Sequence, residues 1–542
     1  MRLGGLLGCC ACLTVAITLS SALATYANVA PVTLPVRVYL TTADLSNALT
    51  RQPDLSLTPL TSAFASARRG GGGGHAADAN AHVITATIVV SPSVTYQQID
   101  GFGGAMTDSS AWLLFTKLAP TARDTVMRDL FDPVHGIGLS FLRVPIGASD
   151  FTADGLPYTY DDLPAGSSDP GLDGFSITHD LPYVVPALQE ALRLNPQLKL
   201  VASPWSPPGW MKTGQPGSFA GTIDPAAFGP LAQYIVRFLQ AYQAQGIPVY
   251  ALTPQNEPGQ ATDGPAVAFP ATQEAAFIGG YLGPALAQAS LHPRLLAYDS
   301  QWRTVDTTPN YPSIVLNDPA AQPYLAGTAW HCYLGSPDVM GQIHQAYPQR
   351  DNYVTECSSG ISHGDVAELL IAAARNWSRG TLLWNLALDA GGGPKEGDWC
   401  PHCMAPVRID QNTGAYTYTR DYYQLGQASA FVRPGAYRIA SSSPVTGYSE
   451  NGLGCASTVS YGVSAVDDVA FKNPDGSIAL LAFNDARGGR LLNIRVGTQG
   501  FSYMLPSCAT ATFVWGALTP AAATPTPTPV PAPPTPRPPH QE

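Results

Sequence analysis

Charged residues are scarce in this chain, and acidic residues outnumber basic ones. Lys, Arg, Asp and Glu make up only 12% of the 542 residues, and 28 basic against 39 acidic side chains give a formal net charge of −11. Without a basic excess, the chain lacks the electrostatic footprint that nucleic acid or an anionic membrane surface requires. Because hydrophobic residues reach 45%, the shortage of charge does not indicate disorder, and several folded domains are expected at this length.

A long apolar run lies at the N-terminus. Arg2 precedes an almost wholly apolar stretch from Leu3 to Leu19, and Ala22-Leu23-Ala24 matches the small-residue pattern of a cleavage site. A transmembrane anchor is the alternative, but the run is short and has no basic stop on its far side. We therefore expect residues 1–24 to be a signal peptide, the mature chain to have no integral membrane segment, and the protein to be secreted.

Cysteine is also sparse, with nine in the chain. The signal peptide would remove three of them, and in an exported chain the remaining six can form disulfides. Cys400-Pro-His-Cys403 is compatible with a redox pair, half of a zinc site or a local loop clamp. Because no second cysteine pair lies nearby, a clamping disulfide between Cys400 and Cys403 is favoured.

The other four cysteines are less informative. Cys455 and Cys508 both lie in the C-terminal β-rich region and form a weaker candidate pair. Cys332 and Cys357 are expected to be small buried apolar residues behind the site described below. The sequence leaves the pairing of these four open.

Strand patterns come first along the chain. Val36–Leu40 alternates like a strand, and Val83–Val90 and Val94–Ile99 are rich in β-branched residues. Between them lies a Ser/Ala/Gly-rich stretch with five consecutive glycines at Gly70–Gly74, which predicts a flexible loop over residues 66–81. We expect residues 25–100 to contribute strands to a β-sandwich whose other strands come from elsewhere in the chain.

Residues 101–420 alternate short apolar runs with amphipathic stretches. Apolar residues share one helical face within residues 228–242 and again within 366–377. Eight strands separated by helices predict an α/β fold of the (β/α)₈ barrel type. An open doubly wound sheet would alternate similarly, but no Gly-x-Gly-x-x-Gly follows the first strand. The candidate strands are Phe102–Gly104, Leu139–Pro145, Leu198–Ser203, Val249–Pro254, Leu295–Asp299, Thr328–Tyr333, Tyr353–Glu356 and Leu382–Leu386.

The pattern becomes all-β from about Asp421. Asn473-Pro-Asp-Gly476 predicts a hairpin turn between Val469–Phe471 and Ile478–Phe483. We expect residues 421–518 to complete the β-sandwich together with the early strands. Residues 519–542 are rich in Pro and Thr, which predicts an extended tail that could associate with a cell wall.

Two glutamates follow predicted barrel strands directly. The run from Val249 ends at Glu257, and the run from Asn352 ends at Glu356. A lone glutamate at a strand end is usually a solvated charge. The C-terminal strand ends of a barrel, however, form its active site, and other polar and aromatic residues fall at the same ends. These are Asp108, Arg143, Trp205, Asn256, His331, Tyr333, Trp384 and Asn385.

Six motifs carry a resemblance to a known family. They are Asp100–Asp108 (DGFGGAMTD), Ser203–Thr213 (SPWSPPGWMKT), Thr253–Pro258 (TPQNEP), His331–Tyr333 (HCY), Thr355–Cys357 (TEC) and Leu383–Leu388 (LWNLAL). In order and type they resemble glycoside hydrolase family 30, the glucosylceramidase (acid β-glucosidase) family, from about Val83 to Trp515. The resemblance implies a (β/α)₈ barrel fused to a β-sandwich and a retaining mechanism.

The resemblance also implies residue roles. Glu257 matches the family's acid/base and Glu356 its nucleophile; Asp108, Trp205, Asn256 and Trp384 match sugar-binding residues, and His331 and Tyr333 match residues flanking the nucleophile. The loop from Lys395 to Cys403 departs from the lysosomal members and should border the aglycone side. We expect a secreted retaining β-glycosidase of the glucosylceramidase or exo-β-glucosidase type, acting on a glycolipid or oligosaccharide β-glucoside without cofactor or metal. The alternatives are an endo-β-1,6-glucanase, a β-xylosidase, or a catalytically dead carbohydrate-binding wall protein.

A retaining mechanism requires a specific spacing and specific protonation states of the two glutamates. In a retaining glycosidase the two carboxyl groups lie ~5–5.5 Å apart. Glu257 must hold a proton, so we expect its pKa to lie above the usual value of about 4.3. Glu356 must stay ionised, with Tyr333 or Arg143 as donors, while Asn256 is placed to hold a sugar 2-hydroxyl and Asn385 to support the site.

Overall fold

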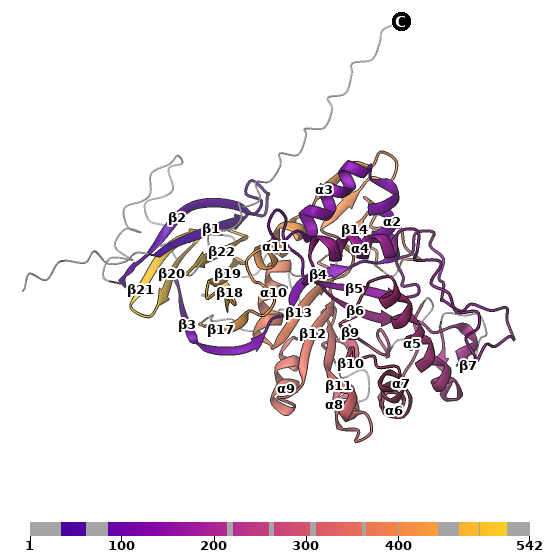
Figure 1. Cartoon of the computed structure of the whole chain (residues 1–542). Coiled ribbons are helices and arrows are strands. Elements are labelled where there is room, and N and C mark those ends of the chain that lie inside the picture. The colour runs from indigo at the N-terminus through magenta and orange to yellow at the C-terminus, as the bar shows by residue number, and fades with distance from the viewer. Residues whose placement is uncertain are drawn as a thin grey trace, which may run out of the picture. The chain divides into compact units, whose positions relative to one another are not determined.

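The computed structural model describes residues 34–60, 85–213, 220–259, 265–303, 310–359, 365–398, 400–442, 466–486 and 488–516 (Figure 1). The expected signal peptide, the five-glycine loop, Cys455 and the Pro/Thr-rich tail lie outside these residues. No helix in the described part of the chain combines the length and the apolar composition that a bilayer crossing requires.

The predicted (β/α)₈ barrel is present. Parallel strands close on themselves in the order β10-β11-β12-β13-β4-β5-β6-β9. The predicted runs correspond to these strands, whose side chains are mostly buried because helices cover their outer faces and a small apolar core fills the interior. The bounds are β4 (Gly101–Ala105), β5 (Phe141–Ile146), β6 (Lys199–Pro204), β9 (Ala251–Leu252), β10 (Arg294–Gln301), β11 (Leu325–His331), β12 (Asp351–Glu356) and β13 (Ser378–Leu383).

The glycines of β4 are explained by the close approach of the neighbouring strand. β4 pairs with β5 in parallel, with Gly103 opposite Phe141. A Cβ atom at Gly103 would lie 1.7 Å from the carbonyl oxygen of Phe141. The glycine-rich motif at 101–104 therefore allows the barrel to close at this point.

Helices surround the barrel, as the periodicity predicts. In α5 the residues Phe228, Leu231 and Ile235 are buried on one face, as predicted. The second helix, α10, was also expected to be amphipathic, but every residue from Val366 to Ala374 is buried, because this helix contacts both β13 of the barrel and the strand Val466–Lys472. The helices are α2 (Asp108–Trp112), α3 (Pro120–Phe131), α4 (Val184–Leu194), α5 (Phe228–Ala244), α6 (Ala271–Phe277), α7 (Gly283–Gln288), α8 (Tyr311–Asn317), α9 (Asp338–Ala346), α10 (Val366–Arg375) and α11 (Arg420–Ser429).

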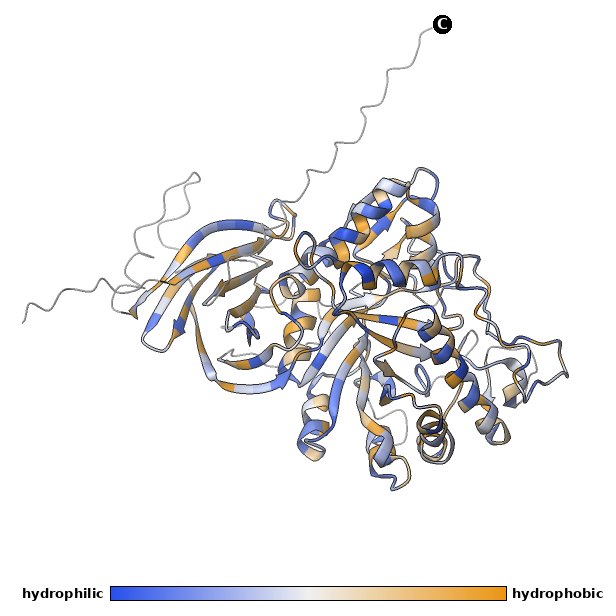
Figure 2. Cartoon of the chain, in the orientation of Figure 1, coloured by the Kyte–Doolittle hydropathy of each residue, from blue (hydrophilic) through white to orange (hydrophobic). Residues whose placement is uncertain are grey.

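N-terminal and C-terminal strands share the second β domain, as predicted. β1 (Leu34–Thr41) pairs antiparallel with β22 (Ala509–Trp515), and β3 (Thr85–Gln98) pairs with β17 (Tyr437–Ser441) and β20 (Arg490–Val496). Hydrophobic and hydrophilic residues alternate along β1, β2 and β3 (Figure 2), because one face of each strand packs on the domain core. The other strands are β2 (Thr50–Pro59), β18 (Val466–Lys472), β19 (Ile478–Asn484) and β21 (Gln499–Leu505).

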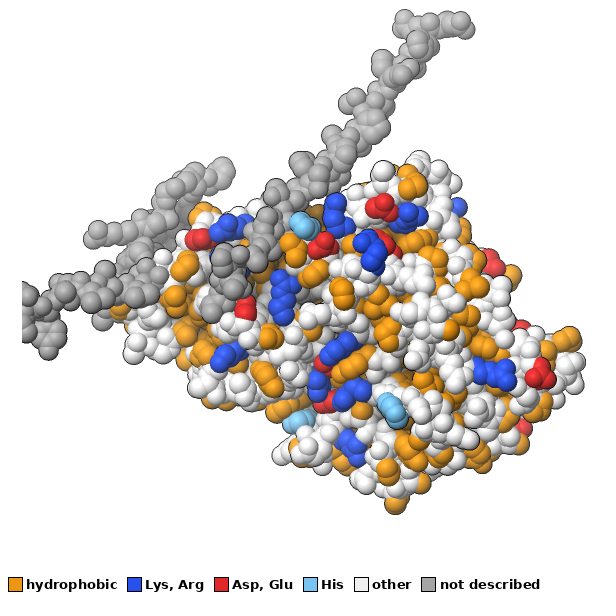
Figure 3. Space-filling view, in the orientation of Figure 1, with side chains coloured by type: hydrophobic (Ala, Val, Ile, Leu, Met, Phe, Trp, Pro, Cys, Tyr) orange, Lys and Arg blue, Asp and Glu red, His pale blue; other side chains and the backbone are white. Residues whose placement is uncertain are grey.

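Two features of this domain differ from the sequence-based expectation. The two β-rich runs before Ile99 form the single strand β3, and β2 was not predicted because its composition is polar. The hairpin between β18 and β19 is confirmed, since Gly476 N–H donates to the carbonyl of Asn473 at 2.9 Å. On the face shown in Figure 3, lysines and arginines are scattered among acidic, hydrophobic and uncharged residues.

Candidate active site

The two strand-end glutamates face one another at the same end of the barrel. Glu356 is the last residue of β12, and Glu257 follows β9 with a left-handed backbone (φ 44°). One oxygen of each carboxyl group and one ring nitrogen of His331 all lie within 4.8 Å of one another. The turn at Glu257 is an unusual conformation for a non-glycine residue, and such conformations concentrate at functional sites.

The buried carboxylate of Glu356 is bound by two side-chain donors. Its Oε1 accepts a 2.9 Å hydrogen bond from the Tyr333 hydroxyl, and its Oε2 binds Nη1 of Arg143. The pKa of Glu356 is raised overall: burial and the neighbouring Glu257 raise it, and the charges of His331 and Arg143 oppose only part of that rise. Burial and Glu356 also raise the pKa of Tyr333 well above its usual value, so this phenol remains a donor. The two donors favour the ionised form of Glu356.

Glu257 has a different environment. Its Oε1 is contacted by Nδ1 of His331 at 2.9 Å and accepts from the Gln301 amide at 2.7 Å. The side chain is 21% exposed, against 8% for Glu356. Glu257 therefore has more access to solvent than Glu356. Gln301, at the end of β10, was missed by the sequence analysis, which took its strand only to Asp299.

Asp299 connects the residues beneath the two glutamates. Its Oδ2 accepts from Arg143 Nη2 at 2.6 Å, and its Oδ1 contacts Nε2 of His331 at 3.2 Å and accepts from Thr355 at 2.6 Å. Although burial opposes it, the Arg143 and His331 charges lower the pKa of Asp299. Asp299 was within a predicted strand but not among the predicted site residues.

His331 carries a positive charge in this arrangement. Burial lowers its pKa, but the carboxylates of Glu356, Asp299 and Glu257 outweigh burial and raise it to about 10. Both ring nitrogens are then protonated at neutral pH, so His331 donates to Glu257 and Asp299 together. A divalent cation bound by Glu257, His331 and Glu356 would have to displace that proton and compete with Arg143, so this cluster suits acid–base chemistry better than metal binding.

Arg143 also contacts residues predicted to bind sugar. Its Nη2 donates to Oδ1 of Asn256 at 2.8 Å, and its guanidinium lies 4.6 Å from the ring centroid of Trp205. Trp205 and Trp384 stack with their centroids 5.0 Å apart. Asn385, beside Trp384, accepts from the Thr107 hydroxyl at 2.7 Å and is fully buried. Arg143, Trp205, Asn256 and Trp384 thus lie in one connected cluster with Glu356, and Asn385 supports it from behind.

Asp108 bonds to residues outside the cluster around the two glutamates. Its carboxylate accepts from Ala153 N–H at 2.7 Å and contacts His179 at 3.1 Å, and within the described part of the chain it has no hydrogen bond to either glutamate. These bonds fasten the loop after β5 to the start of α2. A sugar-binding role for Asp108 therefore stays a prediction without a contact to the catalytic cluster.

Asp150 is a nearby carboxyl that the sequence analysis missed. Burial and the charges of Glu356, Glu257 and Glu396 raise its pKa well above the usual value, which places it electrostatically within the cluster. Its carbonyl accepts from Glu396 N–H at 2.7 Å, which ties it to the loop that departs from the lysosomal pattern. Its position in the sequence could have identified it, because Asp150 follows β5 just as Glu257 follows β9.

The disulfides confirm one prediction and correct another. Cys400 and Cys403 form the predicted clamp, which packs in one apolar cluster with Trp205 and Trp384. Cys332 and Cys357 are buried, as expected, but they are bonded to each other and are not separate apolar residues. Cys508 is also disulfide-bonded, and its candidate partner Cys455 lies outside the described residues.

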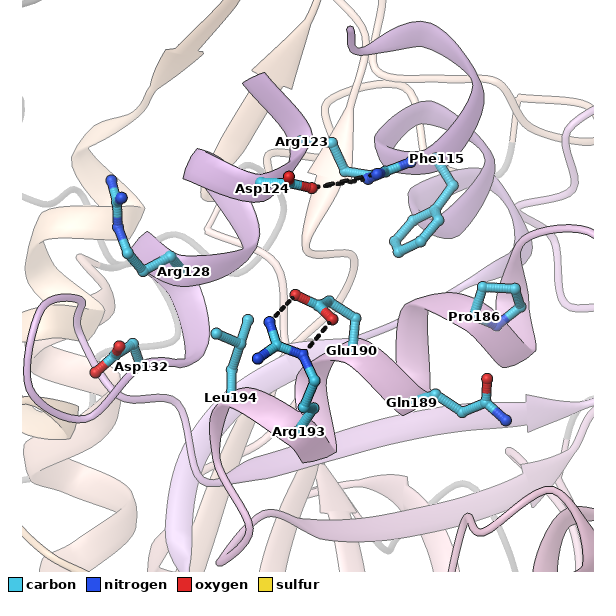
Figure 4. Close-up of a pocket in the computed structure, with 10 residues that line it drawn as sticks. All are labelled: Phe115, Arg123, Asp124, Arg128, Asp132, Pro186, Gln189, Glu190, Arg193 and Leu194. Atoms are coloured by element: carbon cyan, nitrogen blue, oxygen red, sulfur yellow. Dashed lines mark hydrogen bonds and ion pairs between the residues drawn. The ribbon is translucent and has the colours of Figure 1, made fainter. Parts of the chain in front are cut away.

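A groove of about 680 Å³ lies on the outside of the barrel, apart from the strand-end residues (Figure 4). It is lined by residues of α3, α4 and the turn before α3, among them Phe115, Arg128 and Arg193. Its charged side chains pair locally; Arg193, for example, binds Glu190 at 2.6 Å. None of the strand-end residues line it, so it is not the catalytic site.

Comparisons with known proteins agree with this architecture. Residues 99–432 match the family model "Glycosyl hydrolase family 30 TIM-barrel domain", and residues 435–513 match "Glycosyl hydrolase family 30 beta sandwich domain". An endo-1,6-β-D-glucanase of Neurospora crassa is 34% identical over 362 residues, 65% of this chain and 73% of that protein. A putative glucosylceramidase 4 of Caenorhabditis elegans is 32% identical over 383 residues, 65% and 71% of the two chains. The solved structure of the endo-β1,6-glucanase BT3312 superposes with a TM-score of 0.74 at 29% identity, covering 89% of this chain and 99% of that one.

Proposed function

The chain belongs to glycosyl hydrolase family 30, and on that premise we propose that it is a retaining β-glycosidase that acts by double displacement, with Glu356 as nucleophile and Glu257 as acid/base. The observation that carries the proposal is the separation of the two carboxyl groups. Their oxygens approach within 4.8 Å, as a direct attack on a bound sugar requires, whereas an inverting pair stands ~6.5–9.5 Å apart to admit a water molecule.

The environments of the two glutamates support the division of roles. Arg143 and Tyr333 donate to Glu356 and so stabilise a carboxylate nucleophile, and later the carboxylate that leaves the glycosyl intermediate. Glu257 is more exposed, as an acid that meets a departing aglycone and then a water molecule must be. His331 and Gln301 fix its orientation.

The reaction then follows from these positions. Glu257 gives its proton to the glycosidic oxygen while the Glu356 carboxylate attacks the anomeric carbon; the carbon–oxygen bond breaks, and the aglycone leaves as an alcohol. The product is a glycosyl ester on Glu356. Glu257, now a carboxylate, takes a proton from water as the water oxygen attacks the anomeric carbon, which frees the sugar and restores Glu356.

The surrounding residues are proposed to bind the sugar. Asn256 is fixed by Arg143 beside the nucleophile, where it can hold a 2-hydroxyl as charge develops on the ring. Trp205 and Trp384 form an apolar wall beneath the sugar, and Asp150 offers a carboxyl group to other ring hydroxyls. A buried wall of this kind is typical of sugar pockets.

Endo-β-1,6-glucanase activity is the substrate assignment that the relatives favour. The Neurospora crassa enzyme is more similar in sequence than the putative glucosylceramidase, and a solved structure that matches 89% of this chain is also an endo-β1,6-glucanase. This order reverses the sequence-based preference for a glucosylceramidase or exo-β-glucosidase. Glucosylceramidase activity remains the second candidate, because relatives of that name match at nearly the same identity.

The test is a substrate panel with anomer detection. The purified chain is incubated with linear β-1,6-glucan, glucosylceramide and xylan oligomers, and fresh products are followed by NMR. We expect β-1,6-linked oligosaccharides whose new reducing ends first appear as the β-anomer. A first-formed α-anomer would overturn the retaining mechanism, preferential cleavage of another substrate would overturn the glucanase assignment, and no cleavage at all would favour a binding protein.

We also propose that the protein is exported. Two buried disulfides in the described fold are typical of chains that mature in an oxidising compartment, and they agree with the N-terminal signal pattern. Expression of the full chain with and without residues 1–24 tests this, since only the full chain should reach the medium or periplasm.

A further inference from the structure

The Cys332–Cys357 disulfide occupies a specific place relative to the catalytic residues. Cys332 lies between His331, which contacts Glu257, and Tyr333, which donates to Glu356. Cys357 directly follows Glu356. The bond therefore joins the segment carrying a partner of each glutamate to the segment carrying the nucleophile itself.

The pairing of β11 and β12 is irregular at this point. β11 and β12 pair in parallel, but their register shifts between Trp330 and His331, and both strands end at the His331–Glu356 pair. Beyond that pair no strand ladder holds the two segments side by side. Their backbones instead bond outward, with His331 C=O accepting from Trp302 and Cys357 C=O accepting from Trp384. The disulfide is a covalent link between the two segments just past the end of the ladder, in addition to the hydrogen bond from Tyr333 to Glu356.

The burial of the two cysteines favours a positioning role of the disulfide over a redox role. Cys332 and Cys357 are 2% and 1% exposed and belong to the main hydrophobic core. A buried disulfide of this kind is poorly placed to react with a thiol in solution, because exchange requires access to a sulfur atom. Its position instead fixes the distances among Tyr333, His331 and Glu356.

We propose that the Cys332–Cys357 disulfide is a positioning element of the catalytic site, which holds the His331–Tyr333 segment in hydrogen-bonding register with Glu356. This inference rests on the proposed glycosidase function. Misplacement of a reacting group by about 1 Å can cost roughly 100-fold in rate. Loss of the bond should therefore act on the chemical step more than on substrate binding.

The test uses the full chain with the double substitution Cys332→Ala/Cys357→Val, which removes the bond and keeps most of the apolar volume. We expect kcat to fall roughly 10- to 100-fold with KM little changed, and the pH–rate profile to shift because the His331–Glu257 and Tyr333–Glu356 contacts loosen. The matched control is Leu480→Val, a buried change in the second β domain, assayed at the same distance below its own unfolding midpoint. It should keep the wild-type kcat and pH profile.

A double variant that keeps the wild-type kcat and pH profile while its unfolding midpoint falls would show a purely structural disulfide and overturn the inference. If the double variant does not fold, the reversed pair Cys332→Val/Cys357→Ala, which distributes the apolar volume differently, replaces it. A folded reversed pair that keeps the wild-type kcat and pH profile would equally overturn the inference. An inactive wild-type chain would instead overturn the proposed function itself, which separates the two failures.

Discussion

Tyr333 donates a 2.9 Å hydrogen bond to Oε1 of Glu356, on the opposite side of the carboxylate from Arg143. Both oxygens of the proposed nucleophile are therefore bound before any substrate arrives. Because a negative charge with two donors is more stable than one in an apolar cavity, these two bonds oppose the rise in the pKa of Glu356 that burial causes.

Glu356→Gln should abolish turnover. The amide cannot attack the anomeric carbon, and we expect kcat on an aryl β-glucoside to fall by at least about 10³-fold. Far-UV circular dichroism should match wild type, although the lost ion pair with buried Arg143 will reduce stability. Activity close to wild type would remove Glu356 from the mechanism.

Glu257→Ala should separate the two steps. Substrates with an activated leaving group, such as dinitrophenyl β-glucosides, need no proton and should still form the covalent intermediate. Its breakdown should be slow because water lacks a base, and added azide should restore turnover and yield a β-glucosyl azide. If the variant neither accumulates the intermediate nor responds to azide, Glu257 is not the acid/base.

Tyr333→Phe isolates one hydrogen bond. A hydrogen bond to a charged group contributes about 1.5–3 kcal/mol, which corresponds to roughly 10- to 100-fold in kcat if the bond strengthens as Glu356 leaves the intermediate. The measurement is kcat and KM on the same aryl glucoside. Tyr311→Phe, which removes a buried hydroxyl bound to Glu274, is the matched control and should leave kcat near wild type. Equal effects of the two changes would contradict a catalytic role for Tyr333.

Asp299→Asn should weaken the charge pairs beneath the two glutamates. The substitution removes the negative charge that pairs with both Arg143 and His331, so two buried cations lose their common partner. Breaking a buried pair on one side costs about 3–5 kcal/mol. Urea unfolding should show a loss of that order, and the pKa of His331 should fall towards its ordinary value in NMR titrations. An unchanged His331 titration would show that Asp299 does not support its charge.

Stability should decrease between pH 5 and pH 8. Burial raises the pKa of Glu274 to about 7, and burial together with Asp467 raises that of Glu368 to about 8. In this range the folded state holds protons that the unfolded state has lost, so the free energy of unfolding falls as pH rises through these values, by on the order of 1 kcal/mol per pH unit for each group. Asp299, whose pKa is lowered, opposes this only below its ordinary range, near pH 4.

Denaturant unfolding at several pH values measures this slope, and Glu368→Gln is the diagnostic variant. Its neutral amide should raise stability at pH 8 more than at pH 5 and so flatten the profile. The change Glu190→Gln on α4, at a partly exposed carboxylate, is the control and should leave the slope unchanged. Rising wild-type stability from pH 5 to pH 8 would contradict the burial of these two groups in their protonated forms.

Local patterns determined much of this protein. The eight barrel strands, the buried face of α5 and the turn at Asn473–Gly476 depend on residues close in sequence, so periodicity and turn chemistry predicted them. Glu257 and Glu356 were found for the same reason, because parallel strands of a closed barrel must end at one face. The Cys400–Cys403 clamp needs only a three-residue loop.

Only the tertiary structure decides which residues of neighbouring strands lie side by side. Which residue of β11 lies beside which residue of β12 depends on register, so neither the Cys332–Cys357 bond nor the pairing of His331 with Asp299 could be predicted from either strand alone. Asp108 and Asp150 show the same limit, since both follow barrel strands and only packing sends one to His179 and the other to the glutamates. The chain encodes its strand ends locally, whereas the charge balance of the site arises from contacts between strands far apart in sequence.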